Sequence, residues 1–278
     1  MMTELPWLYA AMTAYALATF CAFYDVVPVR AGRVARHAMN ERMVLGLLLV
    51  GVTLLVVTLG ERWLRLGHGP FVNLFELLIS QLFSLGVIYA LVYWRVPLMR
   101  RSALVALPLL WVLGLWVLLI EPADSVLPPT YHNNWLWAHV GFGKVFLSFC
   151  LIGSGLAGVL LLRRWPLFRS WFHTMPSDKI IDGLAWRFML IAFAFHTLML
   201  IAGAVWAQDA WGRYWAWDAL ETSSFLNWLL LGAALHARVS YKVPLRLGAV
   251  LIIAVFVFAF FTYFGTPFYS EAAHKGVI

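Results

Sequence analysis

The chain has 278 residues, of which 63% are hydrophobic and only 12% are charged, and its formal net charge is +7. A soluble domain is about half apolar, so this composition excludes one and indicates an integral membrane protein. The basic charge would suggest nucleic acid as the partner of a soluble protein. Here it lies in the loops between apolar segments and therefore bears on membrane orientation.

Eight apolar segments follow one another, each long enough to cross a hydrocarbon core of roughly 30 Å as a helix. They cover residues 6–26, 43–60, 71–94, 103–120, 135–162, 185–207, 219–239 and 247–264. The first has no basic stretch before it and no small-residue cleavage site after it, so we interpret it as a retained span. We predict an all-α polytopic bundle of about eight transmembrane helices, with residues 1–278 forming a single membrane domain.

Basic residues gather in the first, third, fifth and seventh connections between these segments. They include Arg30, Arg33, Arg36, Arg42, Arg95, Arg100, Arg101, Arg163, Arg164, Arg169, Lys179, Arg238, Lys242 and Arg246. Because loops rich in Lys and Arg stay in the cytoplasm, we expect both termini on the outer, extracytoplasmic side. The connection between the sixth and seventh segments then faces outward as well.

That connection is unusually aromatic, with five Trp or Tyr side chains and two Asp in residues 206–218. An interfacial belt would explain one or two tryptophans at a helix end, because their rings are apolar and their N–H groups need a partner. We therefore interpret the stretch as a surface that holds a flat molecule. If it continues as a helix, Trp211, Trp215 and Asp218 lie on one face.

The order of these residues resembles the tryptophan-rich WWD signature of the CcsA (ResC) family of cytochrome c biogenesis proteins. The matching positions are Trp211, Trp215, Trp217, Asp218 and Glu221, followed by Trp228, His236 and Arg238. A segment from Pro70 to Glu76 and another around His139 resemble further parts of the family, so the similar region is 68–278. The family usually has Asp-Pro-Lys-Glu where this chain has Asp-Ala-Leu-Glu, and Tyr where it has Phe75.

The resemblance implies the heme-handling subunit of the system II cytochrome c synthetase, working with a CcsB (ResB)-like partner in the bacterial cytoplasmic membrane. Such a subunit moves heme b outward and presents it to the Cys-x-x-Cys-His of apocytochrome c. A thiol-reducing protein of the same pathway is a further expected partner. The chain would then be the heme-presenting part of a holocytochrome c synthase, or heme lyase. Such a subunit needs no catalytic nucleophile, because the thiols and vinyl groups come from the substrates, and none is evident in the sequence.

Two histidines are expected on the Trp-rich side. His139 lies near the outer end of the fifth segment, and His274 follows the last one. Two neutral imidazoles, one on each face of the planar heme, are a usual ligand set for low-spin heme iron. The resemblance assigns both residues this role. By spacing alone, an interfacial histidine and a tail histidine would be the simpler interpretation.

His236 lies 18 residues beyond Asp218, or about 27 Å along a helix, so it cannot bind the same iron. The resemblance implies a second heme site there, completed by the partner; the alternative is a histidine that snorkels to the interface. His196, in mid-membrane, is either a spare ligand or a histidine bonded to a neighbouring helix, and we favour the latter. The remaining histidines are expected on solvated surfaces: His37, His68, His132 and His173.

Charged residues near the Trp-rich stretch complete the predicted site, whose external platform spans 206–221. Asp218 and Glu221 could orient the platform through bonds to indole N–H groups, or simply complement a helix N-terminus. Arg213 and Lys144 are placed to reach a heme propionate.

Two other classes stay open at this point. One is a heme delivery protein of the CcmC or CcmF kind, and the other is a transporter or assembly subunit whose tryptophans form only a belt. Cys21 and Cys150 stand singly in apolar segments, which argues against a thiol oxidoreductase and against heme attached covalently to this chain.

Overall fold

The computed structural model describes residues 3–24, 26 and 33–268, and within them it contains helices and no strand. The α-helices are α1 (Leu5–Tyr24), α2 (Arg33–Leu66), α3 (Leu74–Arg95), α4 (Ala103–Leu119), α5 (Asn134–Leu162), α6 (Pro166–Arg169), α7 (Asp178–Trp211), α8 (Ala219–Ser240) and α9 (Leu245–Gly265). Short 3-10 turns lie at Pro97–Ser102 (η1), Pro129–Tyr131 (η2), Ser170–Phe172 (η3) and Thr266–Phe268 (η4). The all-α prediction is confirmed.

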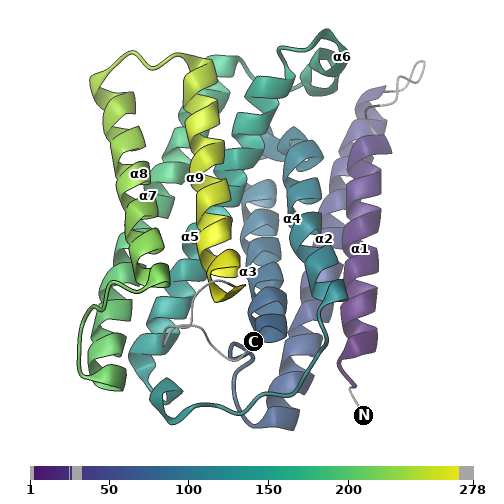
Figure 1. The fold of residues 1–278 in the computed structure, drawn as a ribbon. Coiled ribbons are helices and arrows are strands. Elements are labelled where there is room, and N and C mark those ends of the chain that lie inside the picture. Colours follow the sequence, from purple (N-terminus) through teal and green to yellow (C-terminus); the bar gives the residue numbers. More distant parts are fainter. Residues whose placement is uncertain (1–2, 25, 27–32, 269–278) are drawn as a thin grey trace.

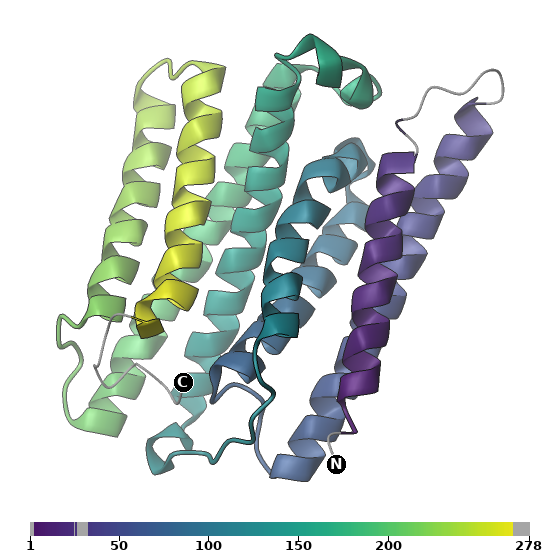
Figure 2. The same cartoon turned by 45° about the vertical axis from the view of Figure 1, so that its right-hand side comes forward.

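Successive long helices run in alternating directions, so that α1 begins and α9 ends at the same end of the bundle (Figure 1). We call this the Trp end, because the connection from α7 to α8 lies there. The opposite end carries Arg163, Arg164 and Arg169 after α5, and we call it the Arg end. Figure 2 shows α1 to α4 on one side of the bundle and α5, α7, α8 and α9 on the other.

Helix α5 is the central element and packs against α3, α4, α7 and α9. Its buried residues include Gly153, Gly155 and Gly158. A Cβ at Gly153 would lie 2.7 Å from the Sδ of Met189 in α7, and one at Gly158 would lie 2.6 Å from a methyl group of Val105 in α4. Small residues let helices approach closely in a membrane, so this stripe lets α5 pack closely on α7 in its own half and on α4 in the other half.

Within the described residues, seven helices are long and apolar enough to cross a membrane: α1, α2, α3, α4, α5, α7 and α9. Helix α8 has 22 residues, but its buried face carries Glu221, Ser224 and Asn227. It still has to run from one end to the other, because α7 ends at the Trp end and α9 begins at the Arg end (Figure 1). Seven of the eight predicted spans are therefore apolar helices of spanning length, and α8, with polar residues on its buried face, is expected to be the eighth.

Helix α7 is longer than its apolar segment at both ends and stops at Trp211. Gly212 has a φ of 73°, a left-handed conformation that glycine adopts without steric strain because it has no Cβ. Residues 213–218 that follow are not helical. The condition for one helical face shared by Trp211, Trp215 and Asp218 is therefore not met, because the helix ends before Gly212.

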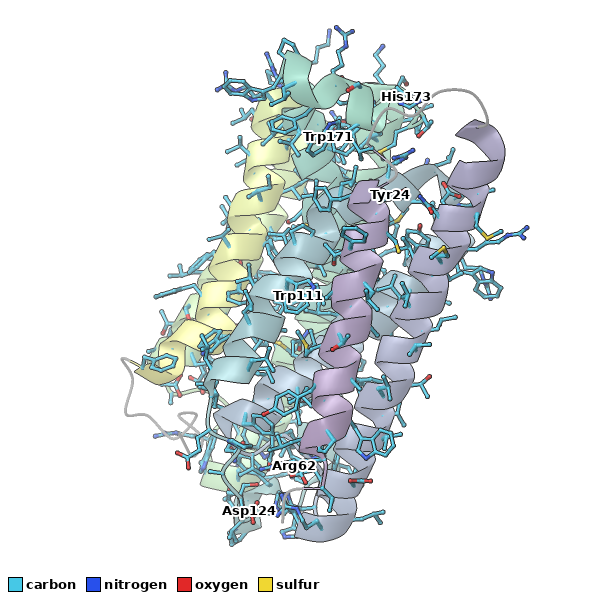
Figure 3. All side chains as sticks on the ribbon, turned by 90° about the vertical axis from the view of Figure 1, so that its right-hand side faces the viewer. Tyr24, Arg62, Trp111, Asp124, Trp171 and His173 are labelled. Atoms are coloured by element: carbon cyan, nitrogen blue, oxygen red, sulfur yellow. The ribbon has the colours of Figure 1, made fainter. Side chains whose placement is uncertain are left out.

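Charged groups lie mainly at the two ends of the bundle. Figure 3 shows Arg62 and Asp124 at the Trp end, and Tyr24, Trp171 and His173 at the Arg end. At the Arg end, the guanidinium of Arg163 donates to the main-chain oxygens of Met175 (2.9 Å) and Pro176 (2.7 Å) and so fixes the turn before α7. Which end faces the cytoplasm stays a prediction.

Candidate functional site at the Trp end

His139 lies in the second turn of α5, whose N-terminus is capped by Asn133. The Oδ1 atom of Asn133 accepts a hydrogen bond from the amide of Trp135 at 2.7 Å. The Nδ1 atom of His139 lies 2.8 Å from the main-chain oxygen of Met199 in α7. A carbonyl oxygen only accepts, so Nδ1 carries a proton, and in the neutral form of the imidazole the lone pair is then on Nε2. A hydrogen bond of this kind fixes the tautomer and orientation of a ligating histidine.

Gly203 makes the close approach of this imidazole to α7 possible. A Cβ at Gly203 would lie 2.5 Å from Nδ1 and 2.7 Å from Cε1 of His139. Any larger residue would push the ring away from the oxygen of Met199. One turn further along α7, the ring of Trp206 stacks on the imidazole, with centroids 5.9 Å apart and planes at 26°.

Trp206 is the centre of a second apolar core, which we call the Trp206 cluster and which also contains Phe71, Leu136 and Trp211. Its indole Nε1 donates to the main-chain oxygen of Thr130 at 3.0 Å, so the buried ring has its polar partner. The ring of Trp211 packs on Trp206 with centroids 4.8 Å apart. Trp211 therefore belongs to the wall beside His139.

The other two tryptophans of the motif form a separate group on α8. Trp215 and Trp217 contact each other edge to face at 5.7 Å, and both pack on Phe225, at 6.3 Å and 6.0 Å. The indole Nε1 of Trp215 is buried and has no hydrogen-bond partner. Trp217 is 67% exposed. The predicted platform thus consists of two parts, with Trp211 in one and the other two tryptophans in the second.

Asp218 and Glu221 fix the start of α8. The Oδ1 atom of Asp218 accepts from the amide of Glu221 at 2.8 Å, and Oε2 of Glu221 accepts from the amide of Ala216 at 2.7 Å. The first bond satisfies a main-chain donor that a helix start leaves open, and the second fixes the chain just before the cap. Together they also hold Trp217 at a φ of 59°, the single positive φ among the described non-glycine residues. Bonds from these carboxylates to indole N–H groups stay a prediction.

Helix α3 begins in the same way. The Oδ1 atom of Asn73 accepts from the amide of Glu76 at 2.9 Å, and Oε2 of Glu76 accepts from the amide of Val72 at 2.8 Å. The two segments that carry the family resemblance are thus both helix starts at the Trp end. Glu76 and Glu221 therefore both have a structural role at these helix starts.

Two cavities flank His139. The larger, about 140 Å³, lies on the side of α3 and α9 and is lined by Phe71, Lys144 and Trp206 among others. The smaller, about 30 Å³, lies on the side of α8 and is lined by Trp215 and Glu221 among others. Small-molecule sites usually have at least roughly 300 Å³. Both cavities are therefore too small to enclose the flat molecule that the sequence predicts.

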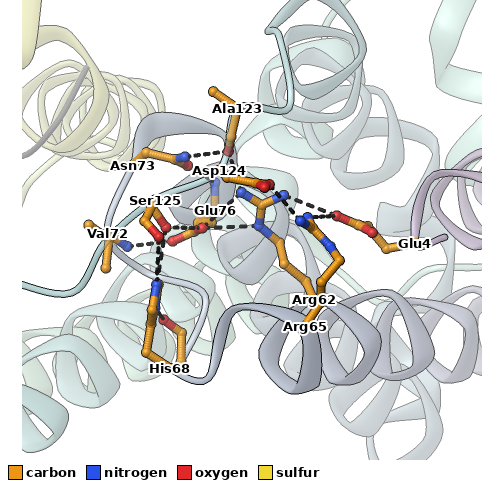
Figure 4. A network of polar contacts seen from close by, with 11 residues as sticks. Glu4, Arg62, Arg65, His68, Val72, Asn73, Glu76, Ala123, Asp124 and Ser125 are labelled. Carbon is orange, nitrogen blue, oxygen red and sulfur yellow. Dashed lines mark hydrogen bonds and ion pairs between the residues drawn. The ribbon is translucent and has the colours of Figure 1, made fainter. Parts of the chain in front are cut away.

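A buried ionic network closes the Trp end next to the larger cavity (Figure 4). The side chains of Glu4, Arg62 and Glu76 are fully buried. Arg62 Nε lies 3.0 Å and Nη2 2.9 Å from Glu76 Oε1, while Nη1 lies 3.1 Å from Glu4 Oε1. Both the guanidinium of Arg62 and the side-chain Nδ2 of Asn73 donate to the main-chain oxygen of Ala123. The network joins α1, α2, α3 and the connection after α4, and its pairings were not predicted.

His68 belongs to this network, which corrects the expectation of a solvated surface residue. It is only 8% exposed, and its ring nitrogens lie 3.0 Å from the main-chain oxygens of Gly69 and Ser125. The turn at Gly67, with a φ of 76°, folds the chain back after α2 and places His68 beneath the connection from α4. Among the other loop histidines, His132 and His173 are exposed as expected, and the side chain of His37 lies outside the described part.

The remaining candidate ligands lie elsewhere. His236 is exposed near the Arg end of α8, where its Nε2 lies 3.4 Å from Ser240 Oγ, and it is thus far from His139. His274 lies outside the described residues, although α9 ends at the Trp end. His196 is fully buried, bonds Ser224 Oγ through Nε2 at 3.1 Å and stacks on Phe146, as the favoured interpretation expected. Arg213 is exposed in the Trp-rich connection.

The fold and this site define a polytopic helical membrane protein with an aromatic site at one end, and comparison with known proteins gives its class. The family model described as "Cytochrome C assembly protein" matches residues 71–274. A cytochrome c biogenesis protein CcsA from Guillardia theta is 30% identical over 246 residues, which cover 80% of this chain and 81% of that protein. The CcsA of Prochlorococcus marinus (strain MIT 9312) is 29% identical over 298 residues, covering 96% and 95%.

The chain therefore belongs to the CcsA family of cytochrome c assembly proteins. Among solved structures, the cytochrome c heme lyase CcmF is similar with a TM-score of 0.67 and 17% identity over 94% of this chain and 46% of that chain. At this identity the likeness shows a shared fold. The CcmC- or CcmF-type alternative is less well supported, because the similar relatives carry the CcsA name.

Proposed function

We propose that this chain is the heme-handling subunit of a system II cytochrome c synthetase, which receives heme b near His236 and presents it at the Trp end for attachment to apocytochrome c. The observation that carries the proposal is the imidazole of His139. It is held in one tautomer by Met199, stacked on Trp206 and flanked by two cavities. These are the features that a ligand for heme iron needs.

The substrate is a flat, largely apolar molecule with two carboxylates. The exposed rings of Trp217 and Tyr214 offer it a surface beside His139, and the unpartnered Nε1 of Trp215 offers a hydrogen-bond donor. His274, in the tail that follows the described residues, is proposed as the second ligand. Arg213 is proposed to contact a propionate. The platform residues Trp211, Trp215, Trp217, Asp218 and Glu221 are proposed to form or hold the surface on which the ring lies.

The chain's own contribution to the reaction is positioning. A thioether forms when a thiol of apocytochrome c adds across a heme vinyl group, and both reacting groups belong to substrates. Holding two reactants in a productive arrangement supplies a large part of the rate of such a step. The fixed imidazole and the aromatic walls restrict how the ring can lie, so that one vinyl edge faces the incoming thiols.

The orientation follows from charge. The Arg end is proposed to face the cytoplasm of a bacterial cell, because it holds the basic connections. His236 then lies at the level where heme would arrive, beside a CcsB-like partner that supplies the second ligand. The Trp end faces the compartment where apocytochrome c is matured.

The test is bound heme per protein in the purified full-length chain with its partner. His139→Ala should leave heme at the Trp end with one protein ligand, shift its absorption spectrum and be partly rescued by added imidazole. His236→Ala should prevent heme from arriving, with poor rescue. His132→Ala, an exposed histidine at the same end as His139, is the matched control. Full heme and an unchanged spectrum in His139→Ala would remove the proposal.

A further inference from the structure

Lys144 lies five residues beyond His139 on α5, about 7.5 Å further into the bundle. Its Nζ donates to Ser80 Oγ of α3 at 2.7 Å, and its side chain lines the larger cavity. Within the described part of the chain, none of the ion pairs involves Lys144. The cavity thus contains a lysine nitrogen whose hydrogen-bond partner is a hydroxyl and not a carboxylate.

Gln81 supplies a second donor to the same cavity. Its side chain is 4% exposed, lines the cavity, and has an Nε2 that is buried without a hydrogen-bond partner. A buried donor that is left without a hydrogen bond costs about 1–3 kcal/mol of stability. Native structures rarely keep one unless a water, an ion or a ligand completes it.

The surroundings make an anion the fitting occupant. An ammonium group in a membrane bundle is costly unless it is paired, and here the second polar group also donates. The nearest acid on α3, Glu76, is engaged by Arg62 and the amide of Val72. The cavity volume of about 140 Å³ is large enough for a carboxylate on a short alkyl chain but too small for a tetrapyrrole. The rest of the wall is largely apolar, with aliphatic side chains such as Leu77 and Leu136 beside the aromatic Phe71, Tyr131 and Trp206.

We propose that Lys144 and Gln81 form a carboxylate subsite that binds one propionate of the heme held at His139. This rests on the proposed function and deepens it. Because His139 lines the same cavity, a propionate bound there would fix the rotation of the ring about the iron–histidine bond. The subsite therefore selects which vinyl edge is turned toward the outside.

The test compares heme with its dimethyl ester, in which both propionates are masked. Each is titrated into the purified full-length chain, for the wild type and for Lys144→Met, Lys144→Arg and Gln81→Leu. A charge-assisted hydrogen bond of the usual strength predicts roughly tenfold weaker binding of the ester by the wild type. Lys144→Met should lose about the same factor for heme and nothing further for the ester.

Lys144→Arg should keep most of the preference for heme, and Gln81→Leu should lose part of it. Lys179→Met, at the start of α7 and the Arg end, should behave as the wild type. The carboxylate subsite would be contradicted if the wild type bound heme and the ester equally, or if Lys144→Met and Gln81→Leu kept the full preference for heme over the ester. Either result would leave the proposed function standing. Wild-type protein that binds neither compound removes the proposed function as well.

Discussion

The Nδ1 atom of His139 lies 2.8 Å from the main-chain oxygen of Met199, and this bond ties α5 to α7 beside the Trp206 cluster. The position of the imidazole therefore depends on the packing of two helices rather than on a flexible loop. Sites built on helices hold their groups more precisely than sites on loops.

Gly203→Ala should disturb this arrangement without removing the histidine. The new methyl group would lie 2.5 Å from Nδ1, so the ring must rotate away and lose its bond to Met199. We expect less bound heme and an altered absorption spectrum. Gly183→Ala, in the same helix with nothing within 4 Å of the added atom, is the control and should bind heme normally. Normal heme in both variants would show that this contact does not position the ligand.

Asp218→Ala should loosen the Trp-rich connection. Loss of a helix cap of this kind costs about 0.5–2 kcal/mol, and it frees the main chain that holds Trp217 at positive φ. Tryptophan fluorescence should shift to longer wavelength, and limited proteolysis between Gly212 and Asp218 should become faster. Thr222→Ala, in the first turn of α8, should change neither measurement. If the Asp218 variant behaves like that control, the cap does not hold the connection.

Arg62→Met should destabilise the bundle strongly. It leaves the carboxylates of Glu4 and Glu76 buried without their guanidinium, and breaking one side of a buried ion pair typically costs about 3–5 kcal/mol. The thermal unfolding midpoint of the purified protein should fall clearly. Adding Glu76→Gln should recover part of the loss, while Arg42→Met, exposed on the same helix, should have little effect. A midpoint within a degree of the wild type would contradict the network's role.

Reporter fusions test the orientation. Fusions after Arg101, Arg169 and Lys242 should report the cytoplasm, and fusions after Asp124 and Gly212 the opposite side, because positive loops are retained inside. The pair at Gly212 and Lys242 also tests whether α8 crosses the membrane. A common location for these two positions would mean that α8 does not span.

The helices could be predicted from the sequence because an apolar run of spanning length has few alternatives in a membrane. Their ends were also accessible: Asn73 and Asp218 stand before a Glu three residues later, as capping residues do. The stop at Gly212 could have been foreseen too, since glycine after a helical run is its usual terminator. This signal indicates that the helix does not continue to Trp215.

The ionic network and the contacts that hold the His139 imidazole against α7 could not be predicted in the same way. Glu4, Arg62 and Glu76 are charges near three different helix ends, and only the packing of α1, α2 and α3 decides that they meet. Gly203 stands in an apolar run where any small residue would satisfy the pattern. Its importance depends on which side chain of α5 faces it, and that is a property of the helix register.

The polar buried face of α8 has a consequence for biosynthesis. A segment with Glu221, Ser224 and Asn227 on one side is a poor substrate for lateral release from the translocon, because each polar group would meet lipid before its neighbours arrive. Helices α7 and α9 are strongly apolar and flank it in the chain. We therefore expect α8 to enter the bilayer only once α9 has been synthesised. The two helices would then insert together as a hairpin, because the apolar α9 offsets the cost of inserting α8.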